Sequence, residues 1–226
     1  MDFVSTIRGS WLMLLQGLSI TALVAIIAIV VGNVIGFISC LMGMSKIAPL
    51  RWLSNAYVWV IRGTPMIVQA FIVYFGVPQL IQMFIPGFTI SAFSASAITL
   101  SINAGAYLSE IFRGGINAVD PGQVEAARSL GFSQGRTMMR IILPQAVRIA
   151  IPSLVNQFII TVKDSSILSV IGLPELVNRA KVYVGSTYQF FATYVLVAIL
   201  YLAIISALMV VSRRIERNLN RDQGKD

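Results

Sequence analysis

Residues 9–45 read GSWLMLLQGLSITALVAIIAIVVGNVIGFISCLMGMS and contain no charged side chain in 37 positions. A helix that crosses a bilayer needs about 20 mainly apolar residues, so this stretch is long enough for one crossing. Two further stretches are equally free of charge, residues 63–109 and residues 182–212. The distribution predicts a chain that crosses a membrane several times.

The overall composition leads to the same class of protein. Of the 226 residues, 57% are hydrophobic and 12% are charged. Soluble domains are roughly 45–50% apolar even with glycine counted, and about 25% charged. Too little polar surface remains to cover a soluble globule, which excludes a soluble enzyme, a disordered chain and a secreted disulfide scaffold. The chain also has one cysteine and no histidine, which excludes an intrachain disulfide and histidine-based metal or base chemistry.

The uncharged stretch of residues 63–109 is too long for one crossing. Gly76-Val77-Pro78 and Pro86-Gly87 lie in its middle, and glycine and proline mark turns. We expect two helices joined by an uncharged hairpin, with residues 62–65 near the cytoplasmic end of the first and Pro65 beginning or kinking it. Residues 147–162 form a shorter candidate span with Pro152 inside it. The predicted fold is an all-α, polytopic membrane bundle of about five spans in a single transmembrane domain, residues 1–226.

The basic residues predict the orientation of these spans, because Lys and Arg concentrate in short cytoplasmic loops. Four of the 17 basic residues fall on one side, namely Arg8, Lys163, Arg179 and Lys181. The other 13 are Lys46, Arg51, Arg62, Arg113, Arg128, Arg136, Arg140, Arg148, Arg213, Arg214, Arg217, Arg221 and Lys225. The bias places the C-terminus in the cytoplasm and the N-terminus outside. The net charge of +8 then reflects this bias and contact with membrane lipids, and we expect no nucleic-acid partner.

Two predicted spans carry polar residues at helical spacing. Asn103, Tyr107 and Glu110 share one face of the third span. Gln157, Thr161 and Asp164 do the same on the fourth, with Lys163 beside them. Polar groups inside a bilayer face a cavity or a partner because they are costly in lipid. The two stripes therefore predict a path for a zwitterion, although pairing of Glu110 or Asp164 with Lys163 or a cytoplasmic arginine would only fix helix register.

Small and charged residues suggest two simpler interpretations elsewhere. Gly32 and Gly36 continue into Cys40 and Gly43 at four- and three-residue spacing, which predicts close helix packing within the bundle. In the predicted outer loop, Glu175, Arg179 and Lys181 fit either a polar docking surface or a plain solvated helix.

The loop of about residues 113–148 carries the most specific pattern. Its core, residues 125–145, reads EAARSLGFSQGRTMMRIILPQ and predicts a short helix, a glycine break and a second helix that ends near Pro144. Asp120 is the expected N-cap, with Pro121 at the first helical position. Gly131 can adopt the left-handed conformation that ends a helix. Ala126 and Ala127 present a small, flat surface.

The spacing of this loop resembles the signature loop of permease subunits of ATP-binding-cassette (ABC) importers. The matching positions are Glu125, Ala126, Ala127, Gly131, Ile141, Leu143 and Pro144. The strings at residues 61–65, 107–116 and 162–166 resemble the polar-amino-acid branch of that family, the histidine, glutamine and arginine type. The resemblance covers essentially the whole chain and implies the type I importer permease fold.

The resemblance also implies partners and roles. Residues 125–130 would form a coupling helix in a groove of a cytoplasmic ATPase subunit, with Glu125, Ala126, Ala127, Gly131, Leu143 and Pro144 as the coupling residues. ATP and Mg²⁺ would bind in that ATPase dimer, leaving this chain without cofactor or enzymatic activity. An extracytoplasmic amino-acid-binding protein and a second permease copy would complete a complex in the bacterial inner membrane.

The resemblance suggests a glutamine-like substrate, with arginine, histidine, glutamate and cystine as alternatives. A rival class is a secondary transporter or channel that works without ATP. Such proteins often contain inverted repeats, and we find none in the sequence.

Overall fold

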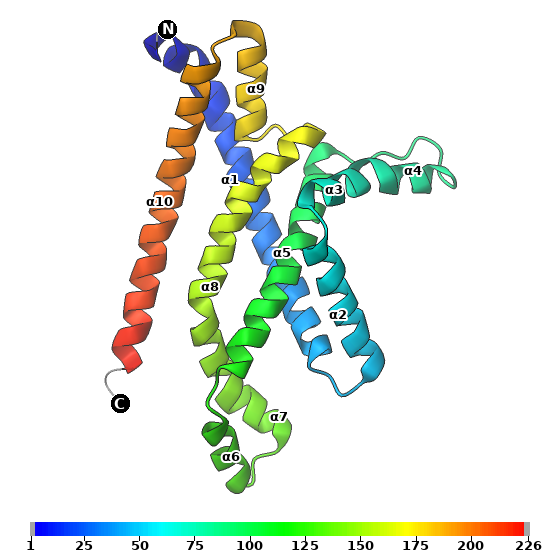
Figure 1. Cartoon of the computed structure of the whole chain (residues 1–226), viewed down its shortest axis with the longest axis vertical. Helices are drawn as coiled ribbons and strands as arrows, with labels where there is room; N and C mark the ends of the chain where they lie inside the picture. The colour runs from blue at the N-terminus through cyan, green and yellow to red at the C-terminus, as the bar shows by residue number, and fades with distance from the viewer. Residues whose placement is uncertain (1–2, 224–226) are drawn as a thin grey trace.

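The computed structural model describes residues 3–223, which form helices joined by short connections, with no strand among them. Figure 1 shows the N-terminal end of α1 beside α9 at one end of the molecule and α6 at the opposite end. The helices are α1 (Phe3–Gly43), α2 (Ala48–Gly63), α3 (Met66–Phe71), α4 (Val77–Gln82), α5 (Ala92–Asn117), α6 (Pro121–Ser129), α7 (Gln134–Thr137), α8 (Leu143–Asp164), α9 (Leu176–Thr187) and α10 (Phe190–Gln223). Two π-helical turns, Ile72–Gly76 and Met138–Ile142, and a 3-10 helix, Ser165–Ile171, lie between them.

The expected membrane bundle is confirmed, with five elements in the places of the five predicted spans. Three of them are long and apolar enough to cross a membrane by themselves: α1, the continuous helix Gln134–Ile171 that contains α8, and the Phe190–Arg217 part of α10. A fourth is the bent pair formed by α2 and the segment Met66–Gln82. The fifth is α5, whose 26 residues extend about 39 Å at 1.5 Å per residue. It is not among the helices apolar enough to cross a membrane by themselves, and it is enclosed by α1, α2, α3 and α8.

The small-residue stripe of α1 packs against α5, as predicted. A Cβ placed on Gly36 would lie 2.7 Å from the Leu108 Cβ atom and 2.8 Å from the Gly105 carbonyl oxygen. Only glycine permits this approach of two helices. Hydroxyl groups add polar links nearby, since the Ser109 hydroxyl of α5 donates to the Ser39 oxygen at 3.2 Å, and the Ser39 and Ser54 oxygens lie 2.9 Å apart. α5 is therefore packed closely against α1.

The second span differs from the sequence prediction. Its helix begins at Ala48, well before the uncharged stretch, and includes both Arg51 and Arg62. After Gly63 the chain bends by 106° into the segment Met66–Gln82, which we call the arm. Figure 1 shows α3 and α4 of the arm running sideways out of the bundle. Placing residues 62–65 at the cytoplasmic end of a span was wrong, because a charged residue that faces protein partners does not mark a membrane boundary. Pro65 does precede a new helix, as expected.

Two prolines thought to interrupt helices are accommodated within them. The chain remains helical through Pro78 and Pro144, and a π-helical turn precedes each one. Proline has no N–H group and clashes with the preceding turn of an α-helix. A π turn is wider, so the chain continues past the proline without losing its direction. The predicted end of the helix near Pro144 was therefore wrong, whereas Pro86-Gly87 does lie in the connection from the arm to α5, with Gly87 at φ +80°.

The segment before α9 contains a buried carboxylate instead of a solvated one. Glu175 is 0% exposed and caps α9 by accepting hydrogen bonds from the backbone N–H groups of Val177 (2.9 Å) and Asn178 (2.7 Å). The Tyr201 hydroxyl of α10 donates a third bond at 3.2 Å. Burial raises the pKa of the Glu175 carboxyl, and these donors partly oppose the rise. Both earlier interpretations of Glu175 were wrong, because this side chain anchors α9 to the bundle.

Candidate functional site

The signature residues Glu125, Ala126 and Ala127 lie in an exposed helix, α6, at the end of the molecule (Figure 1). The loop itself, residues 118–133, is shorter than predicted, because α5 continues to Asn117 and helix resumes at Gln134. α6 begins as expected. The Asp120 carboxylate accepts a hydrogen bond from the Gly122 N–H group at 2.8 Å, and Pro121 occupies the first helical turn.

The end of α6 is equally well defined. Gly131 adopts φ +82°, the left-handed conformation predicted for it. The Phe132 N–H group donates to the Ala127 carbonyl oxygen at 3.1 Å, and the Gly131 N–H group donates to the Arg128 carbonyl oxygen at 3.0 Å. This pair of bonds is the Schellman arrangement, which satisfies carbonyl groups at a helix end. α6 is thus a nine-residue helix with a cap at each terminus.

The two faces of α6 differ in what they contact. Glu125 and Ala126 are exposed, and Leu130 is 79% exposed. Ala127 is 4% exposed and faces the protein, so only one of the two adjacent alanines is available to a partner. An apolar cluster lies at the base of the loop, where Cys40, Ile116, Val119 and Ala146 pack with Phe112, Met138 and Ile142.

Leu143 and Pro144, the end of the signature, are in the first turn of α8. Leu143 is half-buried and Pro144 is exposed. Pro144 lies two positions after the π turn Met138–Ile142, in the first turn of α8, where its missing N–H group is tolerated. Contact of these two residues with an ATPase stays a prediction.

The polar face of α5 looks toward α2 and α3. Arg62, from the end of α2, places its guanidinium carbon 5.3 Å from the centre of the Tyr107 ring and its Nη1 atom 3.5 Å from the Glu110 Oε2 atom. Arg113 also pairs with Glu110. A cavity of about 510 Å³ surrounds these groups, and its lining residues are Asn55, Val58, Trp59, Arg62, Gly63, Tyr107, Glu110 and Arg113. The pairing of Glu110 with arginine, one of the two alternatives for this residue, is present.

Asn103 is on the same face of α5 but is 7% exposed. Its Nδ2 atom donates to the Gln69 Oε1 atom of α3 at 3.0 Å. Asn103 thus has a protein partner one helical turn away from the cavity-lining Tyr107.

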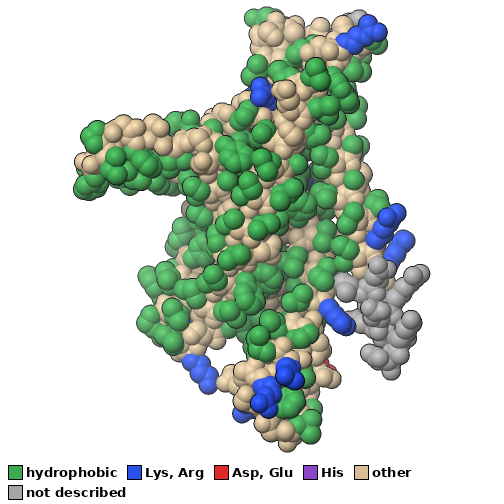
Figure 2. All heavy atoms as spheres, turned by 180° about the vertical axis from the view of Figure 1, so that it is seen from behind, with side chains coloured by type: hydrophobic (Ala, Val, Ile, Leu, Met, Phe, Trp, Pro, Cys, Tyr) green, Lys and Arg blue, Asp and Glu red, His purple; other side chains and the backbone are tan. Residues whose placement is uncertain are grey.

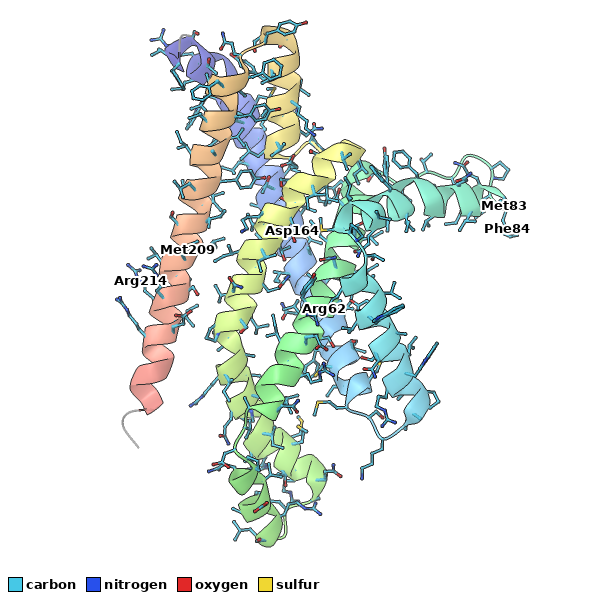
Figure 3. All side chains as sticks on the ribbon, viewed as in Figure 1. Arg62, Met83, Phe84, Asp164, Met209 and Arg214 are labelled. Atoms are coloured by element: carbon cyan, nitrogen blue, oxygen red, sulfur yellow. The ribbon has the colours of Figure 1, made fainter. Side chains whose placement is uncertain are left out.

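Among the described residues, no hydrogen bond or ion pair links the second predicted stripe, on α8, to the first, on α5. Gln157 is buried, Asp164 is half-buried and Lys163 is exposed. Within the part of the chain that the structure describes, neither Lys163 nor Asp164 forms an ion pair within 4.0 Å. Figure 3 shows Asp164 at the end of α8, on a different element from Arg62. α8 meets α5 elsewhere, where a Cβ on Gly115 would lie 2.7 Å from the Ala146 carbonyl oxygen.

Sequence reasoning missed Arg62 and Gln69 as members of this polar region. Arg62 precedes Gly63-Thr64-Pro65, a pattern that indicates a helix break and not a membrane boundary. Gln69 had no signal of its own, because its role depends on the sharp bend that brings it back toward α2.

Comparisons with known proteins agree with this architecture. The family model described as "Binding-protein-dependent transport system inner membrane component" matches residues 32–221. The arginine transport system permease protein ArtQ of Bacillus subtilis is 38% identical over 206 residues, covering 91% of this chain and 92% of ArtQ. The putative glutamine transport system permease protein GlnP of Rickettsia bellii is 38% identical over 208 residues, covering 92% of this chain and 93% of GlnP.

Solved structures give the same result for the fold. A crystal structure of an amino acid ABC transporter with histidines superposes with a TM-score of 0.90 at 38% identity, covering 96% of this chain and 99% of that chain. A chain of the inward-facing MetNI methionine ABC transporter superposes with a TM-score of 0.75 at 18% identity, covering 92% and 96%, which supports the fold alone. The type I permease fold is confirmed. The chain therefore belongs to the family of inner-membrane permease components of binding-protein-dependent ABC transport systems.

Proposed function

We propose that this chain is the translocating subunit of an ATP-driven importer of polar amino acids. The observation that carries the proposal is α6, a helix capped at both ends that exposes Glu125, Ala126 and Leu130 beyond the bundle. A helix can transmit movement from a bound subunit to the membrane helices only if its ends are fixed. Asp120 caps the first turn of α6, and the Schellman turn at Gly131 caps the last. ATP and Mg²⁺ bind in a separate ATPase subunit, and closure of the ATPase dimer moves α6.

The orientation of the complex follows from its charges. Figure 2 shows Lys and Arg side chains mainly toward the end of the molecule that holds α6, with apolar side chains over the flanks. We assign the α6 end to the cytoplasm and the α9 end to the outside, where the amino-acid-binding protein docks. Arg213, Arg214 and Arg217 of α10 anchor the inner leaflet. The side chain of Arg221 and the whole of Lys225 lie outside the described residues.

A second permease copy completes the path. The cavity beside α2 and α5 is bounded by Arg62 and Glu110, which are too polar for a face in contact with lipid tails. A second copy (identical or similar) placed across this face would enclose it, and two copies would match the two-fold symmetry of an ATPase dimer.

The charged groups of the cavity suit a zwitterion. Arg62 can bind the α-carboxylate of an amino acid bidentately, and Glu110 can accept its ammonium group. Both interactions are common to all amino acids, so we assign side-chain selection mainly to the binding protein. Tyr107, Gln157, Lys163 and Asp164 remain the predicted path residues, whereas the Asn103 amide is already bound to Gln69. Among substrates we rank glutamine first, and relatives named for glutamine, arginine and cystine support the class.

Uptake into proteoliposomes tests the function. The chain is reconstituted with its ATPase subunit and supplied with the binding protein and labelled glutamine, arginine, histidine, glutamate or cystine. We expect uptake that requires internal ATP and Mg²⁺ and is fastest with glutamine. Equal uptake in vesicles that contain a non-hydrolysable ATP analogue would overturn the importer assignment in favour of a secondary transporter or channel. ATP-driven uptake of another amino acid, but not of glutamine, would overturn the substrate ranking alone.

A further inference from the structure

The break between α2 and α3 creates an energetic problem inside a membrane protein. α2 ends at Gly63, α3 begins at Met66, and the axis turns by 106°. The last carbonyl groups of a helix have no donor within that helix. At membrane depth, an irregular backbone is tolerated only where protein groups or a water-filled cavity satisfy it. The carbonyl groups at the end of α2 therefore need donors, either from the protein or from water in the cavity that Arg62 and Gly63 line.

Gln69 supplies protein donors at the bend. Its Nε2 atom lies 2.8 Å from the Ile61 carbonyl oxygen, 3.1 Å from the Thr64 carbonyl oxygen and 2.9 Å from the Thr64 hydroxyl oxygen. The side chain reaches back across the bend and is 8% exposed. The Thr64 hydroxyl in turn donates to the Val60 carbonyl oxygen at 2.8 Å. One amide thus ties the start of the arm to the last turn of α2.

The chemistry of the bend also determines the orientation of both amides. Carbonyl oxygens only accept hydrogen bonds, so the NH₂ group of Gln69 must face α2 and its oxygen must face α5. That oxygen needs a donor, which is the Asn103 Nδ2 atom at 3.0 Å. Asn103 is 7% exposed. We call Gln69 and Asn103 the amide clasp. It connects α2, α3 and α5 through one directional series of hydrogen bonds.

The clasp lies directly beside the charged cavity. Arg62 follows Ile61, whose carbonyl group the clasp binds. Tyr107 and Glu110 are four and seven residues after Asn103 on the same face of α5. Arg62 meets both of them. Movement of the α2 end relative to α5 would therefore separate Arg62 from Glu110. Besides that ion pair, the clasp and the Tyr57 hydroxyl, which donates to the Ile102 carbonyl oxygen at 2.6 Å, link α2 and its bend to α5.

We propose that the amide clasp fixes the angle between α2 and the arm and thereby keeps Arg62 opposite Glu110, which makes Gln69 and Asn103 positioning residues for transport. Asn103 then acts through Gln69 and not through contact with the substrate. The transport consequence rests on the proposed function, whereas the geometric consequence does not.

A double-mutant cycle tests how Asn103 acts. Uptake rates are measured in the proteoliposomes for Gln69→Leu, Asn103→Leu and the double variant. Loss of a buried hydrogen bond should slow each single variant about tenfold. The double variant should be no slower than Gln69→Leu, because no clasp remains for the second change to break. Additive losses of about a hundredfold would overturn the proposal, since they would show that Asn103 acts independently. The half-saturating concentration of binding protein should not change.

A distance measurement tests the geometry without transport. Spin labels are placed through cysteine at Trp52 of α2 and at Met83 at the end of the arm, which are 71% and 76% exposed. Figure 3 labels Met83 at this outer tip. The native Cys40 is buried at 2% exposure and does not compete for label. The unsubstituted protein should give one narrow distance distribution in nanodiscs, and Gln69→Leu should broaden or shift it.

Gln82 provides the matched control. It is in the same arm, and its Nε2 atom donates to the Phe88 carbonyl oxygen at 2.7 Å, away from the bend. Gln82→Leu should leave the distribution unchanged. If Gln69→Leu does not assemble, Gln69→Met replaces it, because methionine keeps the length of the side chain and has no N–H group to donate across the bend. A distribution unchanged by loss of the clasp, or changed equally by Gln82→Leu, would overturn the proposal even if uptake occurs as proposed. Absence of uptake in the unsubstituted complex would refute only the proposed function.

Discussion

Replacing Gly131 by valine should weaken binding of the ATPase subunit about 5- to 150-fold, because the change strains the end of α6. Gly131 adopts φ +82°. A β-branched residue in this region costs about 1–3 kcal/mol. A Cβ built on Gly131 meets no atom within 4 Å, so the cost comes from backbone conformation alone and not from a clash. We expect valine to break the Schellman hydrogen bonds so that residue 131 leaves the left-handed region. The side chain of Leu130 would then change its orientation.

The size of the effect follows if the ATPase binds only the capped form of α6. A conformational cost of about 1–3 kcal/mol lowers the fraction of chains with a capped α6 by about 5- to 150-fold. The apparent affinity for the ATPase subunit falls by the same factor. The assay is a titration of the ATPase subunit against the permease in nanodiscs, followed by ATP hydrolysis and coupled uptake. Gly131→Asn should remain within a few-fold of the unsubstituted protein, because asparagine tolerates the left-handed region.

Gly135→Val is the matched control. Gly135 is in α7, its Cβ position is also open, and its φ is not in the left-handed range. This variant should bind the ATPase normally. The reasoning is refuted if Gly131→Val binds as tightly as the unsubstituted chain, or if Gly135→Val weakens binding as much.

Three further outcomes follow from packing and charge. Gly36→Ala should destabilise the bundle by about 1–3 kcal/mol in thermal unfolding, because its Cβ would overlap Leu108, whereas Gly114→Ala, with open space around it, should be neutral. The raised pKa of Glu175 means that the folded protein favours its neutral carboxyl. The stability that this carboxyl contributes is therefore greatest below the ordinary carboxyl pKa and is lost as pH rises through the raised pKa. Glu175→Gln should flatten the dependence of Tm on pH between mildly acidic and neutral conditions. An unaltered dependence of Tm on pH would contradict this account. Arg62→Gln should slow uptake of all transported amino acids by a similar factor, and a selective loss of one substrate would argue against a contact with the common α-carboxylate.

The loop and the glycine stripe show how far sequence reasoning reaches. The cap at Asp120 and the left-handed Gly131 depend on residues a few positions apart, and such local preferences act in any surrounding. The packing of Gly36 was predictable for a similar reason, since a small-residue stripe on an apolar helix has few other uses.

The bend after Gly63 shows where prediction failed. The lengths of the charge-free stretches predicted the membrane spans well, but they misplaced Arg62. A guanidinium can lie in the middle of a bent helix pair when Glu110 and Tyr107 contact it. The predicted helix end at Pro144 was wrong for a related reason. A π turn before a proline lets the helix continue, although proline by itself predicts a helix end. The first error came from side-chain contacts of Arg62, and the second came from a change of helix type before Pro144. Residue spacing in the sequence predicts neither feature.

Sequence by itself determined the membrane class, the all-helical bundle and the capped helix α6, because these depend on composition, periodicity and short-range capping. Tertiary structure alone decided the roles of the polar groups. From the sequence, Glu175 is expected to be a surface charge. In the structure it is buried at the start of α9, and the Tyr201 hydroxyl of α10 donates a hydrogen bond to it. Gln69 and Asn103 are 34 positions apart and meet only because the chain bends by 106° between α2 and the arm. Burial and directional hydrogen bonds act between residues that are close in space, and distances in the folded chain are set by packing and not by sequence order.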